Sequence, residues 1–183
     1  MSVRALWLVV FFCSGCDAGG SGGETRPAEA PPGWEAVTAL AGGASRPRVM
    51  ASLPGGMKKT GETGIDRQIA SYAGPGLHVR FDYGAEGQPG CAARGAGCEI
   101  RDVELAGRPA VLAVSAAPPA DRPYGVVHSY FAAMPAEAGA GGASSTGAGL
   151  LLTVKCVEER ACPAEEIASS VRLVEPRTGG DSY

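Results

Sequence analysis

The chain has 183 residues, of which 28 are glycine and 14 proline, and 19 acidic residues stand against 16 basic ones for a net charge of −3. This length holds one domain of ordinary size together with appendages. No run of basic residues is longer than Lys58-Lys59, whereas binding to nucleic acid needs a basic stripe that releases counterions from the phosphates. The composition therefore excludes nucleic acid as a partner.

The first residues of the chain have the three-part order of an export signal. Arg4 supplies a positive charge, residues 5–12 are uninterruptedly apolar, and the small residues 14–15 precede Cys16. The apolar run is too short to span a bilayer, which needs about 20 residues. A buried core helix is the alternative, but the Gly/Ser-rich segment that follows leaves such a helix nothing to pack against. The order predicts a signal peptide over residues 1–15.

Ser14, Gly15 and Cys16 end this segment with two small residues before a cysteine. They resemble the last three positions of the lipobox of bacterial lipoproteins, although Cys13 stands where that family prefers leucine. The resemblance implies that Cys16 is diacylated and becomes the acylated N-terminus. Two or three acyl chains anchor a protein stably, at about 0.8 kcal/mol per buried methylene. An ordinary secreted protein is the alternative.

Residues 16–33 combine the attachment cysteine with a stretch that has no large apolar side chain. Such a stretch cannot offset its ordering entropy by burial, so we expect a flexible tether between membrane and domain. Asp17 is similar to an inner-membrane retention signal of enteric lipoproteins, which favours the inner membrane. The expected localisation is the cell envelope, with the protein lipid-anchored and facing the periplasm or the exterior.

The globular domain is expected over residues 34–176 and a disordered tail over 177–183. Runs of apolar and β-branched residues predict six strands, at 48–53, 77–83, 99–105, 108–115, 125–134 and 150–157. The third and fourth strands are expected to form a hairpin that turns at Ala106-Gly107. No helical pattern separates the last strands, which favours antiparallel neighbours.

Residues 163–171 predict a C-terminal helix, because a proline opens the segment, acidic residues follow it, and Ile167 and Val171 lie four apart. Residues 65–72 fit either a helix or a strand, and the pattern leaves both open. The segment 135–149 is rich in Gly, Ala and Ser and is expected to be a mobile loop.

Four cysteines remain after processing, namely Cys91, Cys98, Cys156 and Cys162. Four cysteines allow three pairings, and an exported protein meets oxidising conditions. The short separations favour two local disulfides, each of which restrains the unfolded chain by roughly 2–3 kcal/mol. Zinc binding is the alternative, but it prefers cysteines two to four residues apart, and the sequence has no Cys-x-x-Cys redox motif.

The segments 53–56 (Leu-Pro-Gly-Gly), 64–66 (Gly-Ile-Asp) and 81–84 (Phe-Asp-Tyr-Gly) resemble a pattern in uncharacterised exported bacterial proteins. The plan of these proteins is similar to the PsbP-like α/β sandwich, and Arg67 stands where they usually have serine. The resemblance implies a fold and no chemistry. The expected fold class is α+β, an antiparallel sheet with one or two flanking helices in a single domain stapled by two local disulfides.

His78 and Asp82 are expected on one face of a strand, roughly 13 Å apart along it, so they cannot contact each other. A Ser-His-Asp triad would need Ser115 or Ser129 to converge with these residues and His128, and no Gly-x-Ser-x-Gly elbow is present. The interpretation we favour is a solvent-facing polar row, and no catalytic residue is predicted.

His78, Asp82 and Asp66 are nevertheless the candidate ligand-binding face. Metal binding with Asp66 or Asp102 as a third ligand is an alternative, but we predict no metal site and no cofactor. The structural interpretation of the same residues is that Asp66 and Asp82 cap backbone groups and that Gly84 allows a turn. A second candidate ligand surface is aromatic, although in a small domain its members are more often core: Tyr72, Tyr83, Tyr124, Tyr130 and Phe131.

The function expected from these patterns is that of a membrane-tethered, non-enzymatic envelope lipoprotein, acting as a binding or accessory module for an envelope protein or a small ligand. One alternative is an extracytoplasmic hydrolase with a site near His78, and another is a purely structural envelope protein. A deep polar pocket that gathers His78, His128 and carboxylates would favour the hydrolase.

Overall fold

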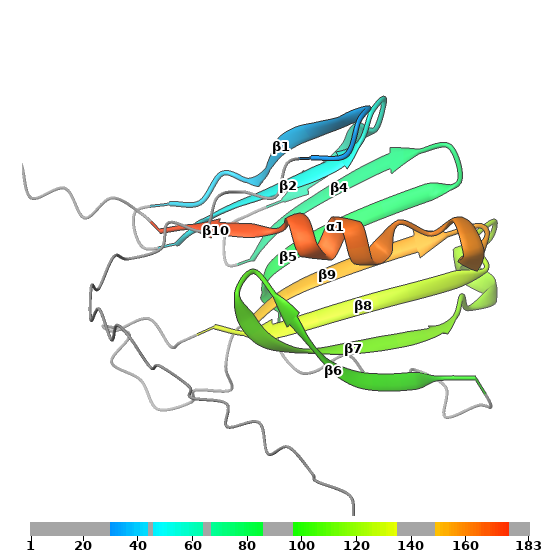
Figure 1. Ribbon diagram of the computed structural model, residues 1–183. Coiled ribbons are helices and arrows are strands. Elements are labelled where there is room, and N and C mark those ends of the chain that lie inside the picture. Colours follow the sequence, from blue (N-terminus) through cyan, green and yellow to red (C-terminus); the bar gives the residue numbers. More distant parts are fainter. Residues whose placement is uncertain (1–29, 44–45, 64–66, 86–96, 135–148, 176–183) are drawn as a thin grey trace, which may run out of the picture.

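Figure 1 shows the computed structural model of the protein, which describes residues 30–43, 46–63, 67–85, 97–134 and 149–175. Several of the expected features lie outside these ranges, namely the signal peptide, Cys16, most of the tether, Asp66, Cys91, the 135–148 stretch and the tail. Within the described ranges, no helix is long and apolar enough to cross a membrane.

The described chain forms two antiparallel sheets and one short α-helix. The small sheet has the order β1 (Trp34–Leu40), β2 (Arg48–Pro54), β10 (Arg172–Val174). The large sheet has the order β3 (Lys58–Thr63), β4 (Gln68–Gly74), β5 (Leu77–Ala85), β9 (Gly149–Cys156), β8 (Val126–Ala133), β7 (Arg108–Ala116), β6 (Glu99–Leu105). The helix is α1 (Ala164–Ser170), and two 3-10 turns are η1 (Pro119–Asp121) and η2 (Glu159–Ala161).

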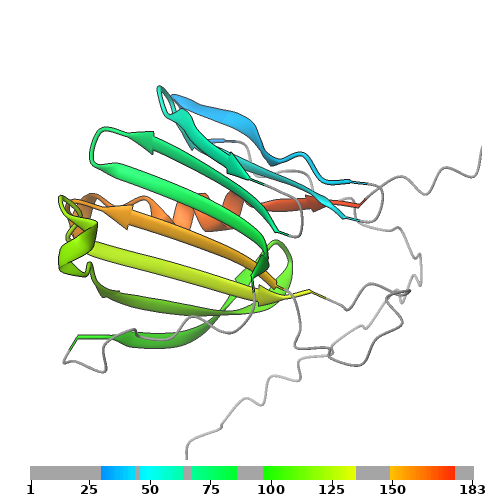
Figure 2. The same cartoon turned by 180° about the vertical axis from the view of Figure 1, so that it is seen from behind.

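The small sheet and α1 cover one face of the large sheet, which we call the inner face (Figures 1 and 2). The core lies between these layers, and its fully buried members include Val49, Leu53, Val79, Phe81, Leu152, Val154, Ile167 and Val171. A helix of seven residues is unstable by itself. It is held here because Ala164, Ile167 and Ala168 are buried against the sheets.

All six strands that the sequence predicts are confirmed, as are the C-terminal helix and the antiparallel pairing of β7, β8 and β9. The β6–β7 hairpin turns at Ala106 and Gly107, whose positive φ angles of 54° and 74° suit a two-residue turn. Residues 68–74 form a strand, so the helical alternative is wrong there. Gly84 allows a bulge rather than a turn, because the register of β5 shifts around it and its φ is 94°.

Three strands were not predicted, and each is held by its neighbour rather than by its own pattern. β3 has the sequence Lys-Lys-Thr-Gly-Glu-Thr, which contains no apolar residue, and it forms the edge of the large sheet by pairing with β4. β1 and β10 both pair with β2. The single antiparallel sheet of the expected fold class is therefore corrected to two sheets.

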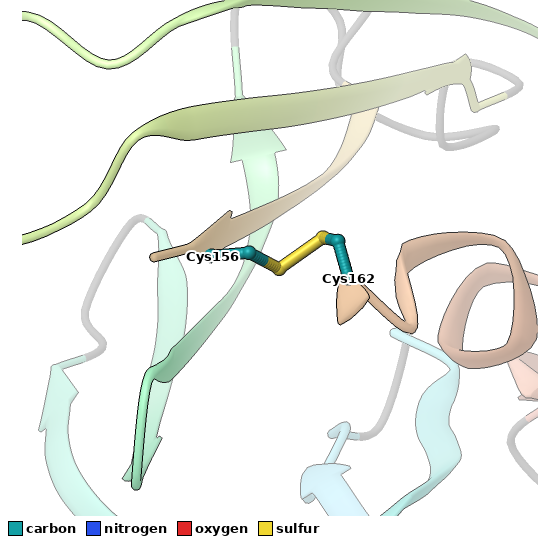
Figure 3. The surroundings of a disulfide bond; sticks show 2 residues. All are labelled: Cys156 and Cys162. Carbon is teal, nitrogen blue, oxygen red and sulfur yellow. A yellow bond between two sulfur atoms is a disulfide. The ribbon is translucent and has the colours of Figure 1, made fainter. Parts of the chain in front are cut away.

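The Cys156–Cys162 disulfide is confirmed, with an S–S distance of 2.08 Å (Figure 3). It joins the end of β9 to the segment that leads into α1. One complete disulfide is thus seen in the described part of the chain, where two were expected. Cys98 is also a disulfide cysteine, but Cys91 lies outside the described residues, so the pairing of these two stays a prediction.

Candidate ligand-binding cleft

The two histidines lie on opposite faces of the large sheet. His78 pairs with Lys155, whereas its neighbour Val79 pairs with Val154, which in turn pairs with His128. Successive residues of a strand point to opposite faces, so His128 shares the inner face with Val79 and His78 lies on the outer face. A pocket that gathers both histidines would favour a hydrolase, and because they lie on opposite faces, the described structure has no such pocket.

Asp82 lies on the outer face with His78, as expected, but it is only 1% exposed. The Nε of Arg67 donates to its Oδ1 at 3.1 Å and the Nη2 of Arg67 to its Oδ2 at 2.6 Å, while the Nη2 of Arg80 donates to Oδ2 at 3.2 Å. We call Asp82, Arg67 and Arg80 the Asp82 cluster. For Asp82 both sequence interpretations, a solvent-facing row and a backbone cap, are wrong, because two guanidinium groups cover and pair the carboxylate.

His78 is half-buried, and its ring packs against that of Tyr124 with centroids 6.2 Å apart. Burial lowers its pKa, and the positive charges of Lys155 and Arg80 lower it further. Ser115 lies in the same outer-face row, but three strand spacings away, which is roughly 14 Å. A catalytic triad around His78 is therefore not assembled.

The described residues also contain no group of three or more His, Cys, Asp or Glu side chains that could hold a metal ion. Asp66, one of the two candidate third ligands, lies outside them. The other, Asp102, is on β6 at the opposite end of the large sheet from β4. The structure therefore does not bring His78, Asp82 and Asp102 together.

A cleft of about 280 Å³ opens between the sheet edge and the helix, and we call it the Tyr130 cleft. It is lined by residues 101–104 of β6, Leu112 of β7, Tyr130 of β8, and Glu165, Ala168 and Ser169 of α1. Its volume lies just below the range for small-molecule sites, about 300–1,000 Å³. The cleft thus suits a small ligand or one side chain of a larger partner.

Tyr130 is 2% exposed, and its hydroxyl is buried with no hydrogen-bond partner among the described residues. Tyr130 of β8 is paired with Leu112 of β7, which is paired with Arg101 of β6, so the three residues form one row across the inner face. Burial, and then the nearby Glu165 carboxylate, raise the pKa of Tyr130 to about 12, so it is neutral near pH 7. A buried hydroxyl left unpaired costs about 1–3 kcal/mol, which a bound polar group can recover.

Arg101 and Glu165 form an ion pair at the cleft, with Nη2 and Oε1 2.6 Å apart. The pair joins β6 to α1. The two side chains are 46% and 71% exposed, and an exposed pair contributes only about 0–1 kcal/mol. A ligand can therefore displace one of the two groups at little cost.

His128 lies two residues before Tyr130 on the same face of β8, and both of its ring nitrogens are buried without a partner in the part of the chain that the structure describes. Burial lowers its pKa, so it is neutral near pH 7. The charges of Glu165 and Arg101 act on both His128 and Tyr130. Two unpaired polar side chains thus lie near one ion pair on the inner face.

A second and larger cleft, of about 440 Å³, lies beside the disulfide. It is lined mainly by apolar groups, including Pro54, Leu77, Cys156, Val157 and Pro163. None of the buried side chains that lack a hydrogen-bond partner in the described structure lines it. It therefore offers volume but no buried polar group to orient a ligand.

The sequence named Tyr130 only as one of five aromatic residues, and it did not single out Arg101 or Glu165. The alternation in β6 is misleading, because the apolar Ile100 is 58% exposed while Arg101 shares the inner face with Leu112 and Tyr130. A charged residue on the buried face of a strand is the signal that could have found the cleft, but it is visible only once the register is known. The other aromatic candidates Tyr72, Tyr83 and Phe131 are buried in the fold.

The chain was also compared with known proteins. No protein-family model, curated protein or solved structure matches it. The resemblance to exported bacterial proteins thus remains a sequence prediction, and the function has to follow from the geometry of this chain.

Proposed function

We propose that the protein is a membrane-tethered, non-enzymatic envelope module that binds its ligand in the Tyr130 cleft. The observation that carries this proposal is the Tyr130 hydroxyl, which lines a cleft, is buried and has no partner among the described residues. Buried polar groups in folded proteins are nearly always hydrogen-bonded. A hydroxyl left unpaired at an accessible cleft is best explained by a ligand that pairs with it.

The location in this proposal rests on the N-terminal pattern and on the lipobox resemblance at Cys16. The Cys156–Cys162 disulfide is compatible with an oxidising compartment, although it supports this only weakly. The hydrolase alternative near His78 finds no supporting contact in the described structure, because the carboxylate of Asp82 is held by two arginines.

Native mass spectrometry of the full chain, extracted from the membrane of its own cell, tests the binding proposal. We expect a small-molecule or peptide adduct on the wild type that is reduced at least tenfold in Tyr130→Phe. Tyr124→Phe is the matched control, because Tyr124 lies against His78 and not in the cleft. A wild type without any adduct would favour the purely structural alternative, and an adduct that survives Tyr130→Phe unchanged would place the ligand elsewhere.

Labelling with a radioactive fatty acid tests the anchor separately. Cys16→Ser should abolish incorporation, whereas Cys13→Ser should retain it, because residue 13 is removed with the signal peptide. Undiminished labelling of Cys16→Ser would refute the lipoprotein assignment and leave the binding proposal for the domain intact.

A further inference from the structure

We infer that the open edge of β6 binds an extended, basic segment of a partner protein as an added strand, with one side chain of that segment in the Tyr130 cleft. This inference rests on the proposed function, since it names the ligand class of the same site. Four features carry it: the backbone groups of β6 that face away from β7, the contrast with the other edge of the large sheet, the charge at the β6 edge, and the cleft beside it.

β6 lies at one end of the large sheet, and among the described residues it pairs only with β7 (Figure 1). The Ala117 N–H donates to the Gly125 carbonyl at 2.9 Å and continues the β7–β8 register. Hydrogen-bonded pairs alternate along an antiparallel ladder, so the odd-numbered residues of β7 bond to β8 and the even-numbered ones to β6. The β6 residues opposite the odd-numbered ones, namely Ile100, Asp102 and Glu104, therefore direct their N–H and C=O groups away from the sheet.

The two edges of the large sheet differ in how far they resist a further strand. β3, at the other edge, contains no apolar residue, and its register shifts between Lys59 and Gly61. Lysines and bulges on an edge strand hinder the pairing of another strand. β6 pairs with β7 along its whole length without a shift, and its Ile100 side chain is 58% exposed. β6 is therefore the edge that can accept a strand.

The charge on the outer face of this edge favours a basic segment. Asp102 and Glu104 stand opposite Val111 and Pro109 of β7, on the outer face, and both acidic residues are exposed. No ion pair within the described ranges involves either carboxylate. Residues of an added strand directly opposite them would lie about 5.5 Å away between Cα atoms, where an opposite charge stabilises the pairing. Two cationic residues that are two positions apart suit this edge.

The same charges disfavour a second copy of the chain as the occupant. Two β6 strands paired over their full length would place the two Asp102 side chains directly opposite each other, because Asp102 is the middle residue of Glu99–Leu105. Like charges in this position destabilise a sheet. The occupant is therefore a segment of a different protein.

The inner side of the same edge opens into the Tyr130 cleft. Asp102 and Glu104 line the cleft although their side chains lie on the outer face, so it is their main chain that borders it. An added strand bonded to this main chain directs every second side chain to the inner face, opposite Arg101 and Val103. The volume of about 280 Å³ admits one such side chain. A polar group at its end can pair with the Tyr130 hydroxyl, which is buried without a partner in the described structure.

Isothermal titration calorimetry on the full chain tests the charge preference with two heptapeptides that are acetylated and amidated. The basic peptide is Thr-Lys-Gln-Lys-Gln-Val-Thr, whose lysines stand opposite Glu104 and Asp102 in an antiparallel added strand and whose valine stands opposite Ile100. In the acidic peptide, glutamates replace both lysines. We expect the basic peptide to bind about tenfold more tightly than the acidic one.

A pair of double variants locates this preference. Asp102→Asn with Glu104→Gln should reduce it to less than about threefold, because the charges opposite the lysines are gone. Glu35→Gln with Glu158→Gln is the matched control. It removes the same number of negative charges from exposed residues that are neither on β6 nor in the cleft, so the preference should persist.

Methylation of the peptide nitrogens tests whether the main chain makes the contact. In the added strand, the N–H groups of the two lysines and the valine face β6, whereas those of the two glutamines face away. Methylating the first three nitrogens should abolish binding, and methylating the glutamine nitrogens should change it by less than about threefold. Hydrogen exchange measured by NMR gives the matching result on the protein: saturating basic peptide should slow exchange at the amides of Ile100, Asp102 and Glu104 and leave β5 unchanged.

Three outcomes would overturn the inference. The two peptides bind equally well, methylation of the glutamine nitrogens is as harmful as methylation of the others, or the three amides are already slow in a dimer of the chain without peptide. The last outcome would place a second copy at the edge. The native mass spectrometry of Tyr130→Phe does not depend on these peptides. An adduct that Tyr130→Phe removes, without binding of the basic peptide, would thus refute the β6 edge and leave the proposed function in place, whereas absence of both adduct and peptide binding would refute both.

Discussion

Asp82 and Tyr130, two buried side chains on opposite faces of the large sheet, differ in how their polar atoms are paired. On the outer face, the Asp82 carboxylate receives three hydrogen bonds from Arg67 and Arg80. On the inner face, Tyr130 and His128 receive none from the described residues. An unpaired buried charge costs several kcal/mol, whereas a neutral hydroxyl or imidazole costs less. The fold must therefore provide hydrogen-bond donors for the Asp82 carboxylate, but it can tolerate Tyr130 and His128 side chains without hydrogen bonds.

This contrast distinguishes a polar cluster that is paired within the fold from polar groups that we propose contact a ligand. In the Asp82 cluster, both carboxylate oxygens accept hydrogen bonds from Arg67 and Arg80. Tyr130 and His128 have no hydrogen-bond partner among the described residues, and Tyr130 lines a cleft. The clusters are also on opposite sides of one sheet, and a substitution can therefore perturb one of them while the other serves as an internal control.

The largest loss of stability is expected when the disulfide that joins the end of β9 to the segment before α1 is removed. Cys156→Ala with Cys162→Ala should lower the free energy of unfolding by about 2–3 kcal/mol, because the unfolded chain loses a cross-link. Urea denaturation measures the loss. Hydrogen exchange should then quicken in α1 before it quickens in β5, where Asp82 lies. Equal acceleration in both elements would contradict a local role for this disulfide.

A somewhat smaller loss is expected when the outer cluster is broken. Arg67→Ala leaves the buried Asp82 with Arg80 alone, but Arg67 is half exposed, so water screens part of its contribution. We expect about 2 kcal/mol, below the 3–5 kcal/mol that follows when a fully buried pair is broken.

Urea denaturation also measures this change, with Arg67→Lys as the control. Lysine keeps the charge but cannot donate two parallel hydrogen bonds, so its loss should be intermediate. The adduct that native mass spectrometry detects on the wild type should not change in either variant. A loss below about 0.5 kcal/mol in Arg67→Ala would show that the cluster does not stabilise the fold.

A third effect is expected on acidification. Burial lowers the pKa of both histidines below 6.5 in the folded protein, so the unfolded chain takes up protons at a higher pH than the folded one does. The free energy of unfolding should therefore fall as the pH drops below about 6.5. Each histidine adds at most about 1.4 kcal/mol per pH unit, the value for one proton.

Denaturation at pH 7, 6 and 5 measures this dependence and assigns it to a face. His128→Leu should remove the inner-face part of the slope, and His78→Gln the outer-face part. If His128→Leu has the same slope as the wild type, the imidazole of His128 is accessible to protons in the folded state and the inner face is less closed than its burial indicates.

The smallest loss of stability is expected for Tyr130→Phe. The substitution removes a buried hydroxyl that makes no hydrogen bond in the described structure, so the free energy of unfolding should not fall and should rise by up to about 1–3 kcal/mol. Thermal unfolding without ligand measures it. A loss above 1 kcal/mol would show that the hydroxyl has a structural partner, and the contrast with Asp82 would then disappear.

Much of the local structure could be predicted from the sequence. The alternation in 77–83, the Ala106-Gly107 turn and the Pro-led helix at 163–171 correspond to β5, the β6–β7 hairpin and α1. The spacing of Cys156 and Cys162 predicted their disulfide. These features depend on residues that are close in sequence, so hydrophobic alternation and turn residues are enough to predict them.

The partner of Asp82 could not be predicted. Arg67 was noticed only as a departure from a pattern, yet it makes the two bonds that cover the carboxylate. Its position follows from the pairing of β4 with β5, which places Ile69 opposite Asp82 and brings the start of β4 over it. β3 was missed for a related reason, because an edge strand without apolar residues is ordered by its neighbour.

The sequence by itself determined the positions of most strands and of the helix, the local disulfide, and the pattern that predicts export. Only the tertiary structure decided that β5 pairs with β9, which places residues 77–85 beside 149–156 and the two histidines on opposite faces. It also decided that Arg101 turns inward toward Tyr130 and Glu165. The physical reason is that register and burial depend on contacts between distant segments, whereas propensity and spacing act over a few residues.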